Sequence, residues 1–410
     1  DLNARGKEVV TFPTLKTTSV DELERIVRDE GVVLADVCQD NAVEVGVSDR
    51  LREIKGLRVV GPSSSAGKIE SQKDYARDSG EKWGLPQPKY HIFSHEMRAI
   101  RFLRDQDEES WFIKAAGLAE GKGALPGRNR QESIEAVERM KEFGEAGEVF
   151  LIEEWIRGDD GSEGEEFSSY AISDGTRYKI VGHAQDNKRV FNGDEGPNTG
   201  GMGCNTPPQL LTSELIEQVD KDIFSPTFNG LREDGAPYQG VLYLGGMAAK
   251  REGVDKPFVV EFNARWGDPE AQVIIPGMDV DFFELGMAIA DGDISQLDIK
   301  TDGKARVVVA GASKGYPENY SDVKGKEIFG LYDVLDMTGV KVYTAGVVKE
   351  DDRFYVNGGR IFYVVGEGAN ILQARERAYA AISYVFVEGN NLHYRDDIGW
   401  RDVARLNQTA

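Results

Sequence analysis

The feature that most constrains the fold is a strand-forming stretch at residues 258–263, whose last residues alternate between apolar and polar. In a β-strand Glu261, Asn263 and the following Arg265 lie on one face, because successive side chains point to opposite sides of the sheet. Burying these polar groups on a central strand is costly unless they have partners. A carboxylate and a carboxamide two residues apart offer oxygen ligands for Mg²⁺, and the arginine can stabilise a transferring phosphoryl group. A structural ion pair is the alternative interpretation.

The first part of the chain alternates between helical and strand patterns. We expect a helix over 19–31 with Ser19 as its N-cap, and buried strands at 31–37 and 56–62 on either side of a helix at 43–55. Such alternation predicts a parallel sheet. Further along, the pattern predicts strands at 111–114, 149–155 and 258–263, and helices at 133–143, 213–231 (with a kink or break at Pro226) and 373–384. A last region of the chain begins at 306–312.

The charge and the cysteine content exclude several classes of function. Acidic residues number 71 against 49 basic ones, a net charge of −22, so the chain lacks the basic footprint that nucleic acids and anionic membranes require. Two cysteines and four histidines argue against a disulfide framework or a Cys/His metal site, and no apolar run reaches the roughly 18 residues of a membrane span. We expect a cytoplasmic protein whose partners are small molecules.

A glycine-rich stretch with two lysines, residues 114–123, follows a predicted strand. Segments 61–69 and 117–122 lack the Walker A spacing, which excludes a P-loop. A flexible turn that carries Lys114 and Lys122 can instead close over a triphosphate with backbone N–H groups and ammonium groups as donors. An ordinary hairpin turn with solvated lysines is equally compatible with this stretch.

Two further segments combine glycine or acidic residues with groups that bind ligands. Residues 185–189 contain Lys188 and Arg189 and lead into 196–203, where four glycines and a proline exclude a helix or a core strand. Exposed N–H groups beside these cations suit a phosphate, and we favour that interpretation over a long surface loop. Carboxylates at 153–154 and 165–166 could accept hydrogen bonds from an adenine amino group or ribose hydroxyls, although surface charge is the commoner explanation.

Taken together, these motifs resemble the ATP-grasp superfamily and, within it, the phosphoribosylamine–glycine ligase family, from about Leu15 to the C-terminus. In that family a strand and a Gly-Gly-Arg-Glu-His turn precede the region that begins here, so we expect the N-terminal domain to be truncated. Ala116 stands where the family usually has Asp, and Cys38-Gln39-Asp40 where it has Gly-Pro-Glu. The resemblance rests on Lys114-Ala-Ala-Gly-Leu-Ala-Glu-Gly-Lys-Gly, Ile152-Glu-Glu, Gln185-Asp-Asn-Lys-Arg, Gly196-Pro-Asn-Thr-Gly-Gly-Met-Gly, Arg265-Trp-Gly-Asp-Pro-Glu, Asn357-Gly-Gly-Arg and Asp397-Ile-Gly-Trp.

The resemblance implies a multidomain α/β and α+β protein with an ATP-grasp fold. A Rossmann-like N-terminal domain would occupy 1–72, the ATP-grasp region 73–300 with a lid subdomain at about 91–157, and a small C-terminal domain 301–410. The implied reaction joins 5-phosphoribosylamine and glycine through a glycyl phosphate, uses ATP, and gives glycinamide ribonucleotide, ADP and phosphate, the second step of de novo purine synthesis. We expect a monomer that requires Mg²⁺, with Mn²⁺ as an alternative metal.

The resemblance also assigns roles to individual residues. Glu261 and Asn263 would bind the metal, and Arg265, Lys122 and Asp268 would act in catalysis. ATP would contact Lys73, Lys114, Lys122, Glu153, Glu154 and Glu166, and the two other substrates would contact Asp186, Lys188, Arg189, Asn198, Thr199, Gly200, Asp268 and Glu270. Another ATP-grasp carboxylate–amine ligase, or a nucleotide-binding protein without catalysis, remains an alternative.

Overall fold

The computed structural model describes residues 10–119 and 121–409. The N-terminal part consists of short helices around two parallel strands, β1 (Leu34–Asp36) and β2 (Arg58–Val60), as the alternating pattern predicts. The helix expected at 43–55 is wrong in one respect, because Gly46 adopts a left-handed conformation (φ 80°) that divides it into two. The helices of this part are α1 (Val20–Asp29), α2 (Asp40–Glu44), α3 (Val47–Arg52) and α4 (Ser64–Ser71).

Two helix starts differ in how they are capped. The expected cap by Ser19 is wrong: its side chain accepts no hydrogen bond from α1, because its backbone (φ −82°, ψ 73°) does not have the extended geometry of a cap. Ser63 does have that geometry, and its hydroxyl accepts a hydrogen bond from the N–H of Ala66. Helix α4 is thereby fixed at its start, close to β13 (Val254–Asn263), which it contacts.

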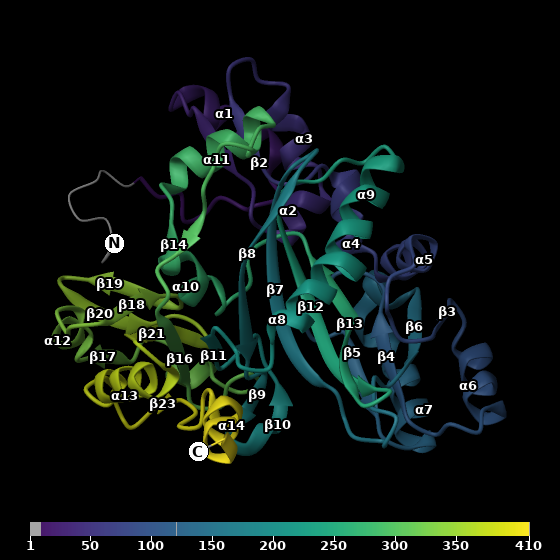
Figure 1. Cartoon of the computed structure of the whole chain (residues 1–410). Helices are drawn as coiled ribbons and strands as arrows, with labels where there is room; N and C mark the ends of the chain where they lie inside the picture. The colour runs from purple at the N-terminus through teal and green to yellow at the C-terminus, as the bar shows by residue number, and fades with distance from the viewer. Residues whose placement is uncertain (1–9, 120, 410) are drawn as a thin grey trace.

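A separate antiparallel sheet lies in the region expected to form the lid subdomain; this region, drawn in blue in Figure 1, is called the lid below. Its strands run in the order β3 (Tyr90–Phe93), β6 (Phe150–Glu154), β4 (Trp111–Ala115) and β5 (Ala124–Gly127). Helices α6 (Glu96–Asp105) and α7 (Arg130–Arg139) pack against it around the buried Leu103, Ile113 and Val137. The strands expected at 111–114 and 149–155 are confirmed, whereas the helix expected at 133–143 begins earlier, where Asn129 caps it, and ends at Arg139.

The largest sheet is antiparallel and runs through most of the molecule. Its strand order is β13-β12-β7-β8-β11-β16-β21-β18, with β23 paired to β16. Because β11 pairs with β16, the sheet continues without a gap across the domain boundary expected near residue 300. Its strands are β7 (Glu165–Asp174), β8 (Tyr178–Asp186), β11 (Gly203–Thr206), β12 (Gln239–Arg251), β13, β16 (Ala305–Ser313), β18 (Val340–Thr344), β21 (Arg360–Gly368) and β23 (Leu392–His393).

Helices cover the central part of this sheet. Of the kink or break expected at Pro226, the break is wrong: the backbone stays helical from α8 (Ser213–Val219) through a π-helical turn at Asp220–Phe224 into α9 (Ser225–Glu233), with the proline in the first turn of α9. Leu215, Phe224 and Phe228 of this helical stretch belong to the core that β12 and β13 line. The other helices of the middle region are α5 (Lys73–Trp83), α10 (Ala271–Ile274) and α11 (Phe282–Asp291).

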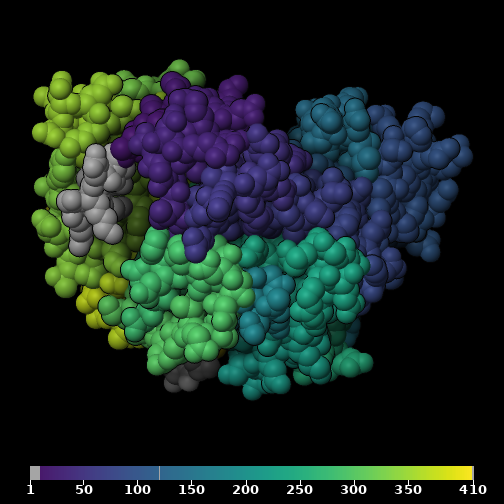
Figure 2. Space-filling model, turned by 90° about the horizontal axis from the view of Figure 1, so that it is seen from above, coloured from purple at the N-terminus to yellow at the C-terminus, as the bar shows by residue number. Residues whose placement is uncertain are grey.

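The C-terminal region adds a smaller sheet and two long helices. Its strands follow the order β19 (Val347–Glu350), β20 (Arg353–Val356), β17 (Glu327–Phe329) and β22 (Phe386–Val387), and α13 (Ile371–Ile382) packs on β16 and β21. Figure 2 shows the N-terminal part lying across the top of the molecule, between this region and the lid. Within the described ranges no helix is long and apolar enough to cross a membrane. The remaining elements are β9 (Arg189–Phe191), β10 (Glu195–Asn198), β14 (Met278–Asp279), β15 (Lys300–Thr301), α12 (Leu331–Leu335) and α14 (Trp400–Thr409).

Candidate functional site

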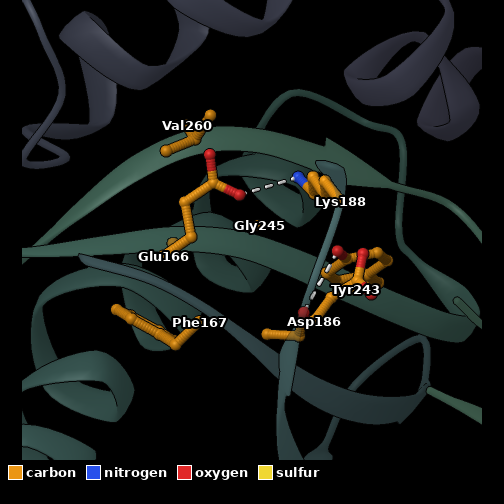
Figure 3. A pocket seen from close by; sticks show the side chains of 9 residues that line it. Glu166, Phe167, Asp186, Lys188, Tyr243, Gly245 and Val260 are labelled. Atoms are coloured by element: carbon orange, nitrogen blue, oxygen red, sulfur yellow. Dashed lines mark hydrogen bonds and ion pairs between the residues drawn. The ribbon is translucent and has the colours of Figure 1, made fainter. Parts of the chain in front are cut away.

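A pocket opens where β7, β8, β12 and β13 lie side by side (Figure 3). Lys188 reaches into it from the chain after β8, and its Nζ lies 3.1 Å from a carboxylate oxygen of Glu166 on β7. This carboxylate raises the pKa of Lys188 well above its usual value in spite of burial, so the side chain is a cation. The pocket is lined by Glu166, Phe167, Ser168, Asp186, Lys188, Tyr243, Gly245, Gly246 and Val260.

Two glycines on β12, Gly245 and Gly246, line the pocket, and their lack of a side chain lets neighbouring side chains pack close to the strand. A Cβ at Gly246 would lie 2.3 Å from the ring of Phe167, and one at Gly245 would lie 3.1 Å from Cγ of Glu261. The first contact is closer than side chains tolerate, so a larger residue at Gly246 would displace Phe167. The glycines thus allow the neighbouring strands to present their side chains close to β12.

A buried ion-pair cluster joins the lid to the central sheet. Lys114 on β4 lies 2.8 Å from Oε2 of Glu153 on β6, and Arg77 on α5 donates to both oxygens of that carboxylate at 2.7 and 3.0 Å. Arg77 also donates to the backbone carbonyls of Val259 (3.1 Å) and Val260 (2.7 Å) on β13. Burial disfavours the charge on Glu153, but Arg77 and Lys114 outweigh it and hold the pKa of that carboxyl at about 2.

Glu153 and Glu154, the two adjacent acidic residues predicted to contact ATP, differ in their surroundings. Both oxygens of Glu153 are engaged by Arg77 and Lys114, whereas Glu154 is partly exposed and pairs with Lys89 at 3.2 Å. Their side chains point to opposite faces of β6, because they are neighbours on a strand. Glu153 thus holds Lys114 in place, and Arg77, for which the sequence predicts no role, completes that arrangement. No local pattern in α5 distinguishes Arg77 from an arginine that would lie exposed on the surface of the helix.

Glu261 lies among cations at the end of β13. Burial would raise its pKa, but Lys188, Lys73, Lys114 and Arg265 together hold the pKa below the usual value, so Glu261 is a carboxylate. Among the described residues, no group donates a hydrogen bond to this carboxylate. Lys73 begins α5, and its backbone N–H donates to the carbonyl of Ala116 in the lid.

Asn263 is the second residue of the predicted metal pair. Its Nδ2 is buried and has no hydrogen-bond partner among the described residues, and its Oδ1 accepts only a long bond of 3.3 Å from Arg265. The described residues hold no cluster of three or more His, Cys, Asp or Glu that would bind a metal unaided. A carboxylate and an underused amide fit a hard cation that takes its remaining oxygen ligands from phosphates and water.

Arg265 follows β13 and is held from the N-terminal part. Its Nε lies 3.1 Å from Oε1 of Glu70 on α4, and its Nη1 donates to the carbonyl of Trp266 at 3.1 Å. A second cavity, bordered by Asp36, Cys38 and Gly61 at the ends of β1 and β2, opens beside Arg265 and Trp266. The local sequence around Glu70 predicts no role for it, because its partner Arg265 is remote in sequence.

The two segments at 185–189 and 196–203 form one structure. Strands β9 and β10 pair, the Nη1 of Arg189 donates to the carbonyl of Gly196 at 2.7 Å, and the hydroxyl of Thr199 donates to the carbonyl of Lys188 at 2.8 Å. Asn198 is exposed on β10. The glycine-rich segment 196–203 thus lies against Lys188 and Arg189, as the sequence predicts. The hydroxyl of Thr199 is engaged in a hydrogen bond within this structure.

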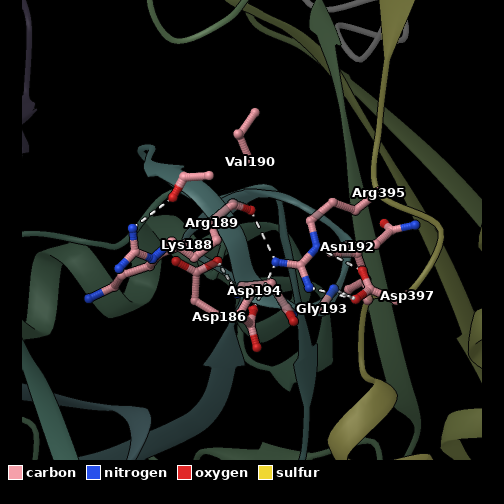
Figure 4. A network of polar contacts seen from close by, with 12 residues as sticks. Asp186, Lys188, Arg189, Val190, Asn192, Gly193, Asp194, Arg395 and Asp397 are labelled. Carbon is pink, nitrogen blue, oxygen red and sulfur yellow. Dashed lines mark hydrogen bonds and ion pairs between the residues drawn. The ribbon is translucent and has the colours of Figure 1, made fainter.

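A buried arginine from the C-terminal region anchors this loop (Figure 4). Arg395 donates to both oxygens of Asp397 at 2.7 Å, to Asp194 at 2.9 Å and to the carbonyl of Arg189 at 3.0 Å. Asp194 also accepts from Arg401 at 2.5 Å. The side chain of Arg395 has no solvent exposure, so its charge is compensated entirely by these groups.

The remaining predicted substrate residues, Asp186, Glu270 and Asp268, differ in their burial and in their partners. Asp186 lies half-buried in the pocket, where desolvation and then the charge of Glu270 raise its pKa well above the usual value. Glu270 is buried and accepts from the hydroxyl of Ser168 at 2.9 Å. Asp268 is exposed and is contacted by Arg360 and Tyr363 of β21.

Lys122 lies in the turn between β4 and β5, where it is exposed on the lid. Its backbone N–H donates to the carbonyl of Ala119 at 2.8 Å, which shapes the turn. The neighbouring Glu120 of the predicted glycine-rich stretch lies outside the described residues. The structure therefore gathers Glu166, Asp186 and Lys188 in the pocket and Glu261 and Lys114 beside it, whereas Lys122 and Glu154 do not line it.

Comparisons with known proteins give a consistent result. A family model described as phosphoribosylglycinamide synthetase, ATP-grasp (A) domain, matches residues 71–271, and the corresponding C-domain model matches 306–401. A phosphoribosylamine–glycine ligase of Chlorobaculum tepidum is 36% identical over 96% of this chain and 90% of its own length. The crystal structure of a phosphoribosylamine–glycine ligase from Thermotoga maritima matches with a TM-score of 0.71 and 31% identity, covering 83% of this chain and 81% of that one.

A longer relative matches over the same region. The trifunctional purine biosynthetic protein adenosine-3 of Bos taurus is 36% identical over 94% of this chain, and this chain spans 37% of that protein's length. The likeness to the trifunctional protein is therefore confined to one part of it.

Proposed function

Because the chain belongs to the phosphoribosylamine–glycine ligase family, we propose that it is an ATP-grasp ligase that joins glycine to 5-phosphoribosylamine. The products are glycinamide ribonucleotide, ADP and phosphate, and the reaction is a step of purine biosynthesis. The observation that best supports this activity in the chain itself is the carboxylate of Glu261, which lies among Lys73, Lys114, Lys188 and Arg265 beside the pocket. Such an arrangement suits a triphosphate and the phosphoryl group that it transfers.

The chemistry requires activation of a carboxylate. The glycine carboxylate attacks the γ-phosphorus of ATP, ADP leaves, and glycyl phosphate forms. The amine of phosphoribosylamine then attacks the carbonyl carbon, loses a proton, and phosphate departs as the carbon–oxygen bond breaks. The protein's contribution is to position the reactants and to stabilise the negative charge that develops.

In this proposal the cationic residues bind the phosphates. Lys114, oriented by Glu153, and Lys73 hold the phosphates of ATP, and Lys122 reaches them from the lid turn. Arg265, oriented by Glu70, stabilises the transferring phosphoryl group. Glu154 serves the adenine and Glu166 the ribose hydroxyls, the roles that the sequence predicts for them.

A divalent cation fits the residues at the end of β13. Glu261 and Asn263 would hold it, since the first is a carboxylate without a hydrogen-bond donor among the described residues and the second has an underused amide. When bound, it would neutralise negative charge on the phosphates; we propose Mg²⁺, with Mn²⁺ as an alternative.

Glycine and phosphoribosylamine would occupy the side of the pocket that the loop residues border. Asp186 and Glu270 lie there beside Lys188, and the loop contributes Arg189, Asn198, Thr199 and Gly200, with Asp268 joined to Gly200 through Arg360. The lid would close over the nucleotide and exclude water, which would otherwise hydrolyse the glycyl phosphate. We propose a monomer in the cytoplasm that acts on these small molecules.

The test is a reconstituted reaction with the purified full chain. Incubation with ATP, Mg²⁺, glycine and freshly prepared 5-phosphoribosylamine should give glycinamide ribonucleotide, identified by mass spectrometry, in a one-to-one ratio with ADP. Omission of either substrate should abolish the product. Formation of a different adduct when another carboxylate or amine is supplied, and none with glycine, would identify another ATP-grasp ligase instead.

A further inference from the structure

One arginine of the C-terminal region contacts two separate parts of the site. Arg360 is the first residue of β21, and its Nη1 donates to the carbonyls of Gly200 at 2.7 Å, Gly201 at 3.3 Å and Asp268 at 2.8 Å. Its Nη2 donates to the carboxylate of Asp268 at 3.0 Å. The glycine-rich loop and the segment after β13 are thus joined through a single guanidinium group.

The carboxylate of Asp268 is fixed on both sides. Besides Arg360, the hydroxyl of Tyr363 donates to Oδ2 at 2.9 Å, and Nε2 of Gln272 donates to Oδ1 at 2.8 Å. Arg360 also lies over the ring of Tyr363, 5.7 Å from its centroid. These contacts restrict the rotamer of Asp268 without burying it, since 46% of its side chain stays exposed.

The loop needs such an anchor because its own backbone provides little. Gly200 and Gly201 belong to no strand, so their carbonyls depend on a donor from elsewhere, and ordering glycine costs more conformational entropy than ordering other residues. The packing is close: a Cβ at Gly200 would lie 2.7 Å from the guanidinium of Arg360. On its other side, a Cβ at Gly201 would lie 2.9 Å from the carboxylate of Asp186.

We propose that Arg360 is a positioning residue that fixes the 199–201 loop and Asp268 for the binding of glycine and phosphoribosylamine. This inference rests on the proposed function. Its contacts are to protein groups, and it acts on the substrates through the loop and Asp268. Among the described residues, those on the proposed ATP side of the pocket, around Lys114 and Glu166, receive no hydrogen bond or ion pair from it. The C-terminal region would therefore govern affinity for the two smaller substrates.

Kinetics of full-length variants test the proposal. Arg360→Met should raise the KM for glycine, phosphoribosylamine or both on the order of tenfold or more and leave the KM for ATP within about twofold, because small displacements of positioned groups are costly. Arg360→Lys should fall between, since a lysine retains the charge but not the forked donors. The matched control is Arg377→Met, which removes an arginine that donates to the carbonyl of Glu367 in the same region, away from the loop.

A second measurement is independent of the ligase activity. Hydrogen exchange of the peptide that spans 196–203 should quicken in the ligand-free Arg360→Met protein and not in the Arg377→Met protein. Equal changes in all three Michaelis constants, or exchange that matches the control, would overturn the positioning role. If the wild-type protein made no glycinamide ribonucleotide but the loop exchange still responded to Arg360, the proposed function would fail while the anchoring of the loop stood.

Discussion

The carboxylate of Glu70 lies 3.1 Å from the guanidinium Nε of Arg265 and joins helix α4 to the residue that follows β13. Its other oxygen accepts a hydrogen bond from the backbone N–H of Ala264 at 2.7 Å. Arg265 is thus oriented by the N-terminal part of the chain, and the arginine proposed to stabilise the transferring phosphoryl group depends on a carboxylate from another helix. Burial raises the pKa of Glu70 to about 7, in spite of the opposing effect of Arg265.

This raised pKa predicts a pH-dependent stability. A carboxyl that binds its proton more tightly when folded favours folding at low pH, so its contribution is complete below pH about 4.5 and is lost as the pH rises to about 7. The free energy of unfolding of the wild type relative to Glu70→Gln should fall across that window, by about 3 kcal/mol at most. Urea unfolding of both proteins at several pH values measures this difference, and a constant difference would show that Glu70 does not titrate there.

Replacement of Glu261 by Gln should remove most ligase activity and leave the fold intact. The substitution keeps the shape of the side chain but removes the charge proposed to hold the metal, and we expect a loss on the order of 10²-fold or more in kcat. Steady-state kinetics at saturating Mg²⁺, with circular dichroism to check folding, give the result. Glu284→Gln on the exposed start of α11 is the control; near-wild-type activity of the Glu261 variant would refute the metal assignment.

The lid lysine should affect one substrate more than the others. Lys122→Ala is expected to raise the KM for ATP more than the KM for glycine, because the turn between β4 and β5 is proposed to reach only nucleotide phosphates. Lys141→Ala, an exposed lysine of the same subdomain, should change neither constant. If the Lys122 variant raised both constants equally, the turn would have a different role.

Loss of the buried Arg395 should destabilise the protein strongly. Arg395→Met leaves Asp194 and Asp397 without their shared cation, and breaking a buried ion pair in this way costs about 3–5 kcal/mol. By contrast, Arg353→Met removes an exposed arginine that lies 3.7 Å from Glu327 and should cost less than about 1 kcal/mol. Thermal and urea unfolding of the two variants provide the comparison, and similar losses would mean that the Arg395 cluster contributes little.

Local sequence patterns account for much of the fold. The strands of the lid and the apolar stretch at 258–263 were predictable, because alternation and β-branched residues specify them within a few positions. The interruption at Gly46 was not, since a glycine is compatible with both a helix and its end. The continuity of the large sheet through β11 and β16 depends on pairing between distant strands, which no local window contains.

In the site, too, local patterns predict some residues, whereas contacts between distant residues determine others. Alternation along β13 is sufficient to place Glu261 and Asn263 on one face, and the glycine-rich segments are visible by composition. Glu70, Arg77 and Arg360 are single charged residues whose partners lie far along the chain. Their roles become apparent only when the fold brings both ends of each contact together.

The most direct test of the account follows an oxygen atom. With glycine labelled by ¹⁸O in both carboxylate oxygens, the proposed glycyl phosphate requires that one labelled oxygen leave with the inorganic phosphate and the other remain in the amide of the product. Mass spectrometry of the phosphate, formed by the full chain with ATP and 5-phosphoribosylamine, should show one ¹⁸O per phosphate. Unlabelled phosphate, or ADP released at the same rate without glycine, would contradict the account.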